Sequence, residues 1–243
     1  MKNILCLRAV AGVALIVSLA GLFACASGRA DRRNPGSYVV PGYAITDFSD
    51  YSRFAVLDFH EGAPGSGDPD VCSMAGLAFT RGSVEAGAGE IVADRIHLAM
   101  ERSGYGMLER SAAREAFLKA GEEDRMANGA SLAAAASRAL DAGAVVMGCV
   151  SRFEELVGGK YSADKPAHVS FGVVVFDPAR GEVIWAGKFD KMQRSLFEDL
   201  FQWRIFLKGS MAWQTAETLS GVGADFLVAR MPKPGHQRKK TGP

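Results

Sequence analysis

The side chains able to do chemistry in this sequence are few and widely separated. No two of the four histidines stand at the spacing that would place a pair of metal ligands on one helix. Gly65-Ser66-Gly67 lacks the outer residues of a nucleophile elbow, and Asp68 with Asp70 supplies too few oxygens for Ca²⁺. We therefore expect no catalytic site, no metal site and no cofactor, and a protein that is not an enzyme.

Cysteine is the exception, because Cys25 stands at the end of a distinctive N-terminal stretch. Lys2 and Arg8 give a short positive start, and an apolar run over residues 9–24 follows. A charged start, an apolar stretch and small residues at its end are typical of a secretory signal peptide. The run falls short of the roughly 20 residues that a permanent membrane-spanning helix needs. We expect it to be removed before Cys25.

The end of this run, Leu22-Phe23-Ala24-Cys25, resembles the lipobox of bacterial lipoproteins. The resemblance implies that the Cys25 thiol receives a diacylglycerol and that, after cleavage, the new amino terminus is acylated, palmitate being an expected chain. Two or more acyl chains hold a protein firmly on a membrane. Phe23 is bulkier than the residue usual at this place, and an ordinary cleaved signal peptide is the alternative.

The residues after the cysteine bear on which membrane holds the anchor. Ala26 and Ser27 follow it, with no Asp directly after Cys25. By analogy with the sorting rule of enterobacterial lipoproteins, this favours the periplasmic face of the outer membrane. No second stretch is long and apolar enough to span a bilayer, so the lipid would be the only anchor.

Composition divides the chain into four parts. We expect a signal peptide over 1–24, a lipid-anchored tether or arm over 25–50, an α/β domain over 51–231 and a disordered basic tail over 232–243. Residues near the C-terminus hold a run of basic side chains and no acid, so the rest of the mature chain is acidic. An acidic body argues against a nucleic-acid partner.

The body of the chain alternates strand and helix patterns. Apolar and β-branched runs predict strands, and apolar residues at helical spacing predict helices. Both faces of the 144–150 run are apolar, which is typical of a central strand in a covered sheet. In chain order we expect strand 53–59, helix 84–103, strand 105–110, a short helix after Ser111, helix 131–142, strand 144–150, hairpin strands 168–176 and 182–189, and a broken helix over 211–231.

This order predicts an α/β fold with one mixed sheet of about five strands covered by helices. The later half of the arm also carries aromatic and apolar residues, among them Tyr38 and Val39. We expect that half to pack on the domain.

Several short motifs resemble the periplasmic α/β domain shared by the lipoproteins CsgG and PelC and the amino-terminal domain of TolB. They are Val56-Leu57-Asp58-Phe59, Leu108-Glu109-Arg110, the strand with Gly148, and the hairpin that ends in Trp185. The resemblance implies that Val56 and Phe59 fill the core, that Glu109-Arg110 anchors a strand end, that Gly148 allows close packing and that Trp185 caps the sheet.

Members of this family act by binding and assembly, in export channels, polysaccharide-export rings or the activation of wall synthesis. The resemblance therefore implies an envelope partner and no catalytic residues. The chain lacks an obvious pair of amphipathic hairpins of the kind that builds the curli pore, and this departure puts a pore function in doubt.

An aromatic segment over 195–207 is the strongest candidate for a partner surface. Aromatic residues are enriched where partners bind most tightly, and we select Phe197, Glu198, Phe201 and Trp203 as candidate contacts. Covering the sheet is the alternative role. The same surface would also serve self-assembly into a homo-oligomer.

Two further cysteines, Cys72 and Cys149, remain once Cys6 is cut off and Cys25 is lipidated. An oxidising periplasm would allow a disulfide between them, although a small buried thiol in an apolar strand is also normal. The sequence leaves both readings open.

These observations predict an outer-membrane-anchored, non-catalytic periplasmic lipoprotein that binds a partner in envelope assembly or export. The alternative is an oligomeric ring or channel component of a polysaccharide or protein export system.

Overall fold

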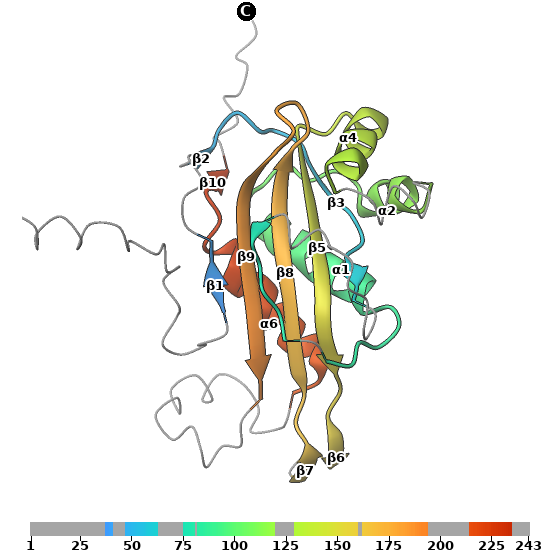
Figure 1. Cartoon of the computed structure of the whole chain (residues 1–243). Helices are drawn as coiled ribbons and strands as arrows, with labels where there is room; N and C mark the ends of the chain where they lie inside the picture. Colours follow the sequence, from blue (N-terminus) through green and yellow to red (C-terminus); the bar gives the residue numbers. More distant parts are fainter. Residues whose placement is uncertain are drawn as a thin grey trace, which may run out of the picture.

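The described part of the chain forms one mixed sheet between two layers of helices (Figure 1). The computed structural model describes residues 37–40, 47–62, 75–80, 82–119, 129–159, 162–193 and 214–234. The sheet order is β1 (Tyr38–Val39), β9 (Glu182–Met192), β8 (His168–Asp177), β5 (Ala144–Glu154) and β3 (Phe54–Val56), with β4 (His60–Glu61) also pairing with β5. The expected mixed sheet of about five strands is confirmed.

The sheet is antiparallel from β1 to β5 and parallel at its other edge. β8 pairs with both β5 and β9 over most of its length. β3 pairs in parallel with the start of β5, and β4 pairs in parallel with the same strand farther along. The strand expected over 53–59 is therefore shorter, Phe54–Val56, and the edge continues in β4, which the sequence patterns placed in a loop.

Helices cover both faces, which explains why β5 and β8 are apolar on both sides. α1 (Ala88–Arg102) and α6 (Ala216–Val228) lie behind the sheet in Figure 1, and α2 (Arg110–Lys119) and α4 (Gly129–Leu140) lie near the end where β5 begins. The first layer packs on a core that includes Val146, Val150, Val169, Phe171 and Phe189. The second packs on Val145, Met147, Cys149, Val174, Phe176 and Ala186.

Two glycines allow this packing. A Cβ on Gly148 would lie 2.2 Å from the Phe59 ring and 2.3 Å from the Gly172 carbonyl oxygen, so the close-packing role expected for Gly148 is confirmed. A Cβ on Gly223 would lie 2.5 Å from the Phe189 ring. Gly223 therefore lets α6 approach the sheet, and the helix runs without the break that its glycines predict.

Two expected elements differ from the structure. The first helix begins at Ala88 rather than near Val84, because Gly87 adopts a left-handed conformation with φ of 86°. The strand expected over 105–110 is wrong, since Met107 forms only one isolated bridge with Phe54. The chain enters α2 at Arg110, so only Leu108 and Glu109 separate the bridge from the helix.

The sequence patterns did not predict two small sheets. β6 (Val157–Gly159) and β7 (Ser162–Lys165) form a hairpin that projects beyond the ends of β5 and β8 (Figure 1). β10 (Lys233–Pro234) pairs in parallel with β2 (Asp47–Phe48). The first residues of the expected tail are thus ordered, and β1 shows that the later half of the arm packs on the sheet.

Other expectations lie outside the described residues. These include the signal peptide, Cys25, Cys72, the candidate contacts between residues 197 and 203, and the chain beyond residue 234. Within the described ranges, no helix is both long enough and apolar enough to cross a bilayer.

Candidate functional site

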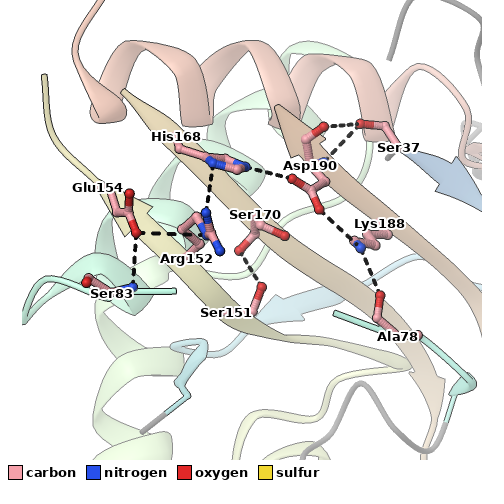
Figure 2. Close-up of polar contacts among 10 residues, drawn as sticks. All are labelled: Ser37, Ala78, Ser83, Ser151, Arg152, Glu154, His168, Ser170, Lys188 and Asp190. Carbon is pink, nitrogen blue, oxygen red and sulfur yellow. Dashed lines mark hydrogen bonds and ion pairs between the residues drawn. The ribbon is translucent and has the colours of Figure 1, made fainter. Parts of the chain in front are cut away.

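Charged and polar side chains gather on the sheet where β5 and β9 end and β8 begins (Figure 2). Strand register brings them together: His168 lies opposite Glu154, and Ser170 lies between Arg152 on one side and Asp190 on the other. We call the side chains of Arg152, Glu154, His168, Ser170, Lys188 and Asp190 the polar cluster. It lies on the face that carries α2 and α4, beyond the apolar part that those helices cover.

A β-bulge in β5 puts the cluster on one face. Up to Cys149, the odd-numbered residues of β5 point toward α4. The register shifts between Val150 and Arg152, and one extra residue in a strand reverses the alternation beyond it. Phe153 consequently packs in the core on the other side, while Arg152 joins the cluster.

His168 is held from both ring nitrogens. Its Nε2 atom lies 2.9 Å from Asp190 Oδ1, and its Nδ1 atom lies 3.1 Å from Arg152 Nη1. A guanidinium can only donate, so Nδ1 accepts and Nε2 carries the proton donated to the carboxylate. Both ring nitrogens of His168 are therefore engaged in hydrogen bonds, and neither is free to act as a base.

Asp190 and Lys188 connect the cluster to distant parts of the chain. Lys188 Nζ lies 3.2 Å from Asp190 Oδ2 and donates to the Ala78 carbonyl at 2.8 Å. The Ser37 hydroxyl donates to the Asp190 carbonyl at 3.2 Å, and the Asp190 amide donates back to it at 2.9 Å. These contacts fix the start of β1 and the segment over 75–80 on the sheet.

Glu154 joins the cluster to the opposite edge. Its Oε1 atom accepts from the Ser83 amide at 3.2 Å, and its Oε2 atom lies 3.2 Å from Lys165 Nζ. The Arg152 guanidinium lies 3.9 Å away. Glu154 therefore connects the chain leading into α1 with the β6–β7 hairpin.

Both carboxylates of the cluster are held in the charged form. Burial acts to raise the pKa of Asp190, but the hydrogen bond from His168 and the charge of Lys188 outweigh it and lower that pKa. Burial likewise acts to raise the pKa of Glu154, but the hydrogen bond from the Ser83 amide and the charges of Lys165 and Arg152 outweigh it and lower that pKa. The cluster is therefore a set of ion pairs at neutral pH.

This arrangement is suited to holding strands and presenting a polar face. Its positive and negative groups satisfy one another, and no hydroxyl or thiol bonds to His168 in the part of the chain that the structure describes. The Ser170 hydroxyl is buried without a hydrogen-bond partner among these residues. In the described ranges, no three carboxylate, histidine or cysteine side chains are grouped as metal ligands.

A second charged group ties helices to the edge strand. Arg110 bonds to Asp58 and to the Val56 carbonyl, and its Nε atom lies 2.8 Å from Asp94 Oδ1. The strand over 105–110 whose end Glu109-Arg110 is expected to anchor is absent; Arg110 instead joins α1, α2 and the end of β3. These contacts hold helices and the edge strand together.

The aromatic segment proposed to bind a partner leaves the described chain after Gln193 and returns at Gln214. The Gln214 amide donates to the Gln193 side chain at 2.8 Å, and the Ala216 amide donates to Glu155 Oε2 at 3.0 Å. The described residues that precede and follow the segment, Gln193 and Gln214, therefore meet at the end of the domain that carries the polar cluster. Phe197, Glu198, Phe201 and Trp203 themselves lie outside the described residues.

Cys149 is buried and takes part in a disulfide. Of the two readings left open for this thiol, the structure supports the bonded one. Its partner lies outside the described residues.

Comparison with known proteins gives weak likenesses of fold. No family of proteins matches the sequence, and no curated protein does. A PelC dodecamer from Paraburkholderia phytofirmans is similar over 81% of this chain and 98% of that chain, at 10% identity and a TM-score of 0.45. E. coli LpoB covers 62% and 60% of the two chains, at 15% identity and a TM-score of 0.38.

A lipoprotein from Neisseria meningitidis covers 65% of this chain and 96% of that chain, at 13% identity and a TM-score of 0.37. These scores describe a partial likeness in the arrangement of strands and helices, and we infer no function from them. The resemblance of the motifs to CsgG and TolB stays a prediction.

The polar cluster was missed by sequence reasoning, although the sequence holds a signal for it. Polar residues alternate at the ends of strands that are otherwise apolar, as in Lys188 and Asp190 or Arg152 and Glu154. Such alternation marks the half of a strand that has one polar face.

Proposed function

We propose that this chain is a non-catalytic periplasmic lipoprotein, anchored to the outer membrane through Cys25, that binds a partner in envelope assembly or export. The observation that carries the anchor is the motif Leu22-Phe23-Ala24-Cys25 at the end of a signal-like stretch. The way the following chain attaches to the sheet edge through β1 fits a tether that leads directly into a folded domain.

The hydrogen bonds of His168 argue against its acting as a general base. A general base needs a free nitrogen within reach of the proton that it removes, and both nitrogens of His168 are engaged with Asp190 and Arg152. We therefore assign the polar cluster the role of holding the strands of the domain together.

Metabolic labelling tests the anchor. Wild-type protein should incorporate labelled palmitate and sediment with outer membranes, and Cys25→Ala should lose the label and move to the soluble periplasmic fraction. An unlabelled wild type together with a membrane-bound Cys25→Ala would overturn the proposal. Cys149→Ala serves as the control, since loss of an internal cysteine should leave the label in place.

The partner contact is assigned to Phe197, Glu198, Phe201 and Trp203. Support comes from their aromatic composition and from the hydrogen bond between Gln193 and Gln214, the described residues on either side of this part of the chain. Hot-spot residues of this type commonly cost 2 kcal/mol or more, roughly thirtyfold in affinity, when truncated to alanine.

A photo-crosslinking residue at Phe201 tests this contact in cells. We expect an adduct with an envelope component at Phe201 and none at Leu118, an exposed residue of α2. An adduct at twice the mass of the chain would instead support self-assembly into a ring or channel. Light scattering of the soluble Cys25→Ala protein separates these outcomes, because a persistent monomer counts against a ring.

A further inference from the structure

We propose that the end of the domain formed by the β6–β7 hairpin and the last residues of β9 rests on the membrane surface. Val157 and Met192 would enter the headgroup region there. This orientation rests on the proposed function, because it requires the lipid on Cys25. Three observations on the described residues carry it.

The first is the direction from which the tether arrives. Tyr38 pairs with Lys188 and Val39 pairs with Gly187 in antiparallel register, and Ser37 bonds to the backbone of Asp190. Followed back toward Cys25, the chain therefore runs toward the end of β9. Because His168 pairs with both Met192 and Glu154, that end also carries the β6–β7 hairpin (Figure 1).

The second observation is the reach of the tether. Twelve residues from Cys25 to Ser37 span at most about 40 Å when fully extended. The opposite end of the sheet, at the β8–β9 turn, lies roughly 25–30 Å beyond Ser37, because eight residues of β9 rise about 3.4 Å each. Turning that end toward the bilayer would stretch most of the tether back along the domain, at a cost in conformational entropy.

The third observation is that apolar side chains are exposed at the end of the domain where the tether joins the sheet. Val157 on the hairpin is 55% exposed, and Met192 at the end of β9 is 48% exposed. The amphipathic edge of a protein gains stability when such side chains enter the interface of a bilayer. Leu118, on α2 near the opposite end, is 58% exposed. Exposed apolar side chains therefore occur at both ends of the domain, and the position of the tether determines which end we place on the membrane.

Charged side chains of both signs are interspersed at this end. The residues described there include the basic Arg95, Arg152, Lys165, Lys188 and Lys191 and the acidic Glu85, Glu154, Glu155, Asp164, Asp190 and Glu217. The contact should therefore be apolar and depend little on salt. A weak contact suffices, since the anchor keeps the domain at a high effective concentration near the bilayer.

Tryptophan fluorescence on the full lipidated protein tests the orientation. Val157→Trp and Leu118→Trp are matched, because both place the ring at an exposed aliphatic position. Each protein is reconstituted in phosphatidylethanolamine–phosphatidylglycerol vesicles, with and without lipids brominated near the headgroup. The quenching of wild-type protein, which has three native tryptophans, is subtracted.

We expect the brominated lipids to remove about half of the emission added by Val157→Trp and little of that added by Leu118→Trp, as for a ring at the membrane interface. Equal quenching of the two, or stronger quenching of Leu118→Trp, would overturn the orientation.

Amide hydrogen exchange on the otherwise native sequence avoids any membrane affinity of the new tryptophan. Anchoring should slow exchange in β6 and β7 relative to soluble Cys25→Ala and leave α2 unchanged, and V157D/M192D should abolish the slowing. Anchored protein without slowing would contradict the orientation alone. Absence of labelled palmitate from the wild type would instead contradict the proposed function.

Discussion

His168 Nε2 lies 2.9 Å from Asp190 Oδ1 across β8 and β9, and the same carboxylate contacts Lys188 through its other oxygen at 3.2 Å. The backbone of Asp190 also holds Ser37 at the start of β1. Asp190 thus joins neighbouring strands through its carboxylate and holds the point where the tether meets the sheet through its backbone.

The lowered pKa of Asp190 predicts a pH dependence of stability. Because its pKa in the folded protein lies below the ordinary 3.8, the charged form stabilises the fold at higher pH, and this stabilisation is lost as pH falls below about 4. Asp190→Asn should lower the free energy of unfolding at pH 7 by about 1–2 kcal/mol and flatten its fall between pH 5 and 2. Urea unfolding at several pH values measures both effects.

Glu115→Gln is the control for this prediction. Glu115 also has a lowered pKa, caused by its hydrogen bond and ion pair with Lys119, but the pair is exposed on α2. We expect its unfolding curve to follow that of the wild type. If both variants flattened the pH dependence of the free energy of unfolding equally, the ion pairs of Asp190 would contribute no more than an exposed pair.

Gly148→Ala should destabilise the domain strongly. The added methyl would lie 2.2 Å from the Phe59 ring and 2.3 Å from a backbone oxygen of β8, and overpacking of this kind costs about 1–3 kcal/mol or more. Gly221→Ala in α6 is the matched control, since its nearest neighbour is 3.7 Å away. It should stabilise the helix by up to about 1 kcal/mol. Thermal unfolding of the two variants should move in opposite directions.

The ion pair between Arg110 and Asp58 should contribute more than its exposed counterparts. The side chains are only 16% and 11% exposed, and removing one partner of a buried pair costs about 3–5 kcal/mol. We expect Arg110→Ala to lose about 3 kcal/mol on that scale. Arg53→Ala, whose pair with Asp141 is largely exposed, should lose less than about 1 kcal/mol. Similar losses in chemical denaturation would contradict this ranking.

The disulfide of Cys149 predicts that its partner is Cys72. Under the proposed processing, Cys6 is removed and Cys25 is lipidated, so Cys72 is the one remaining cysteine of the mature chain. Peptide mapping without reductant should recover the two cysteines in one linked species, and reduction should cost about 2–4 kcal/mol of stability. A free Cys72 thiol in the unfolded, unreduced protein would refute the assignment.

The main strands and helices could be predicted because their patterns are local. The alternation in β8 and β9 and the apolar stripe of α1 depend on nearby residues, and burial on both faces explains the unbroken apolar run of β5. The bridge at Met107 could not be separated from a strand, because the difference depends on where α2 begins.

The polar cluster depends on contacts that no local pattern records. Ser37 and Asp190 are 153 residues apart, and Lys188 and Ala78 are 110 apart. The bulge before Arg152 also reverses which residues of β5 share a face. A strict alternation extended from Cys149 would place Phe153 in the cluster and Arg152 in the core.

The hydrogen bond between Gln214 and Gln193 has an evolutionary consequence. A segment whose two ends meet can be lengthened or replaced at an entropic cost that grows only with the logarithm of its length. The chain between these residues can therefore diverge rapidly among descendants of one ancestor while β9 and α6 stay unchanged.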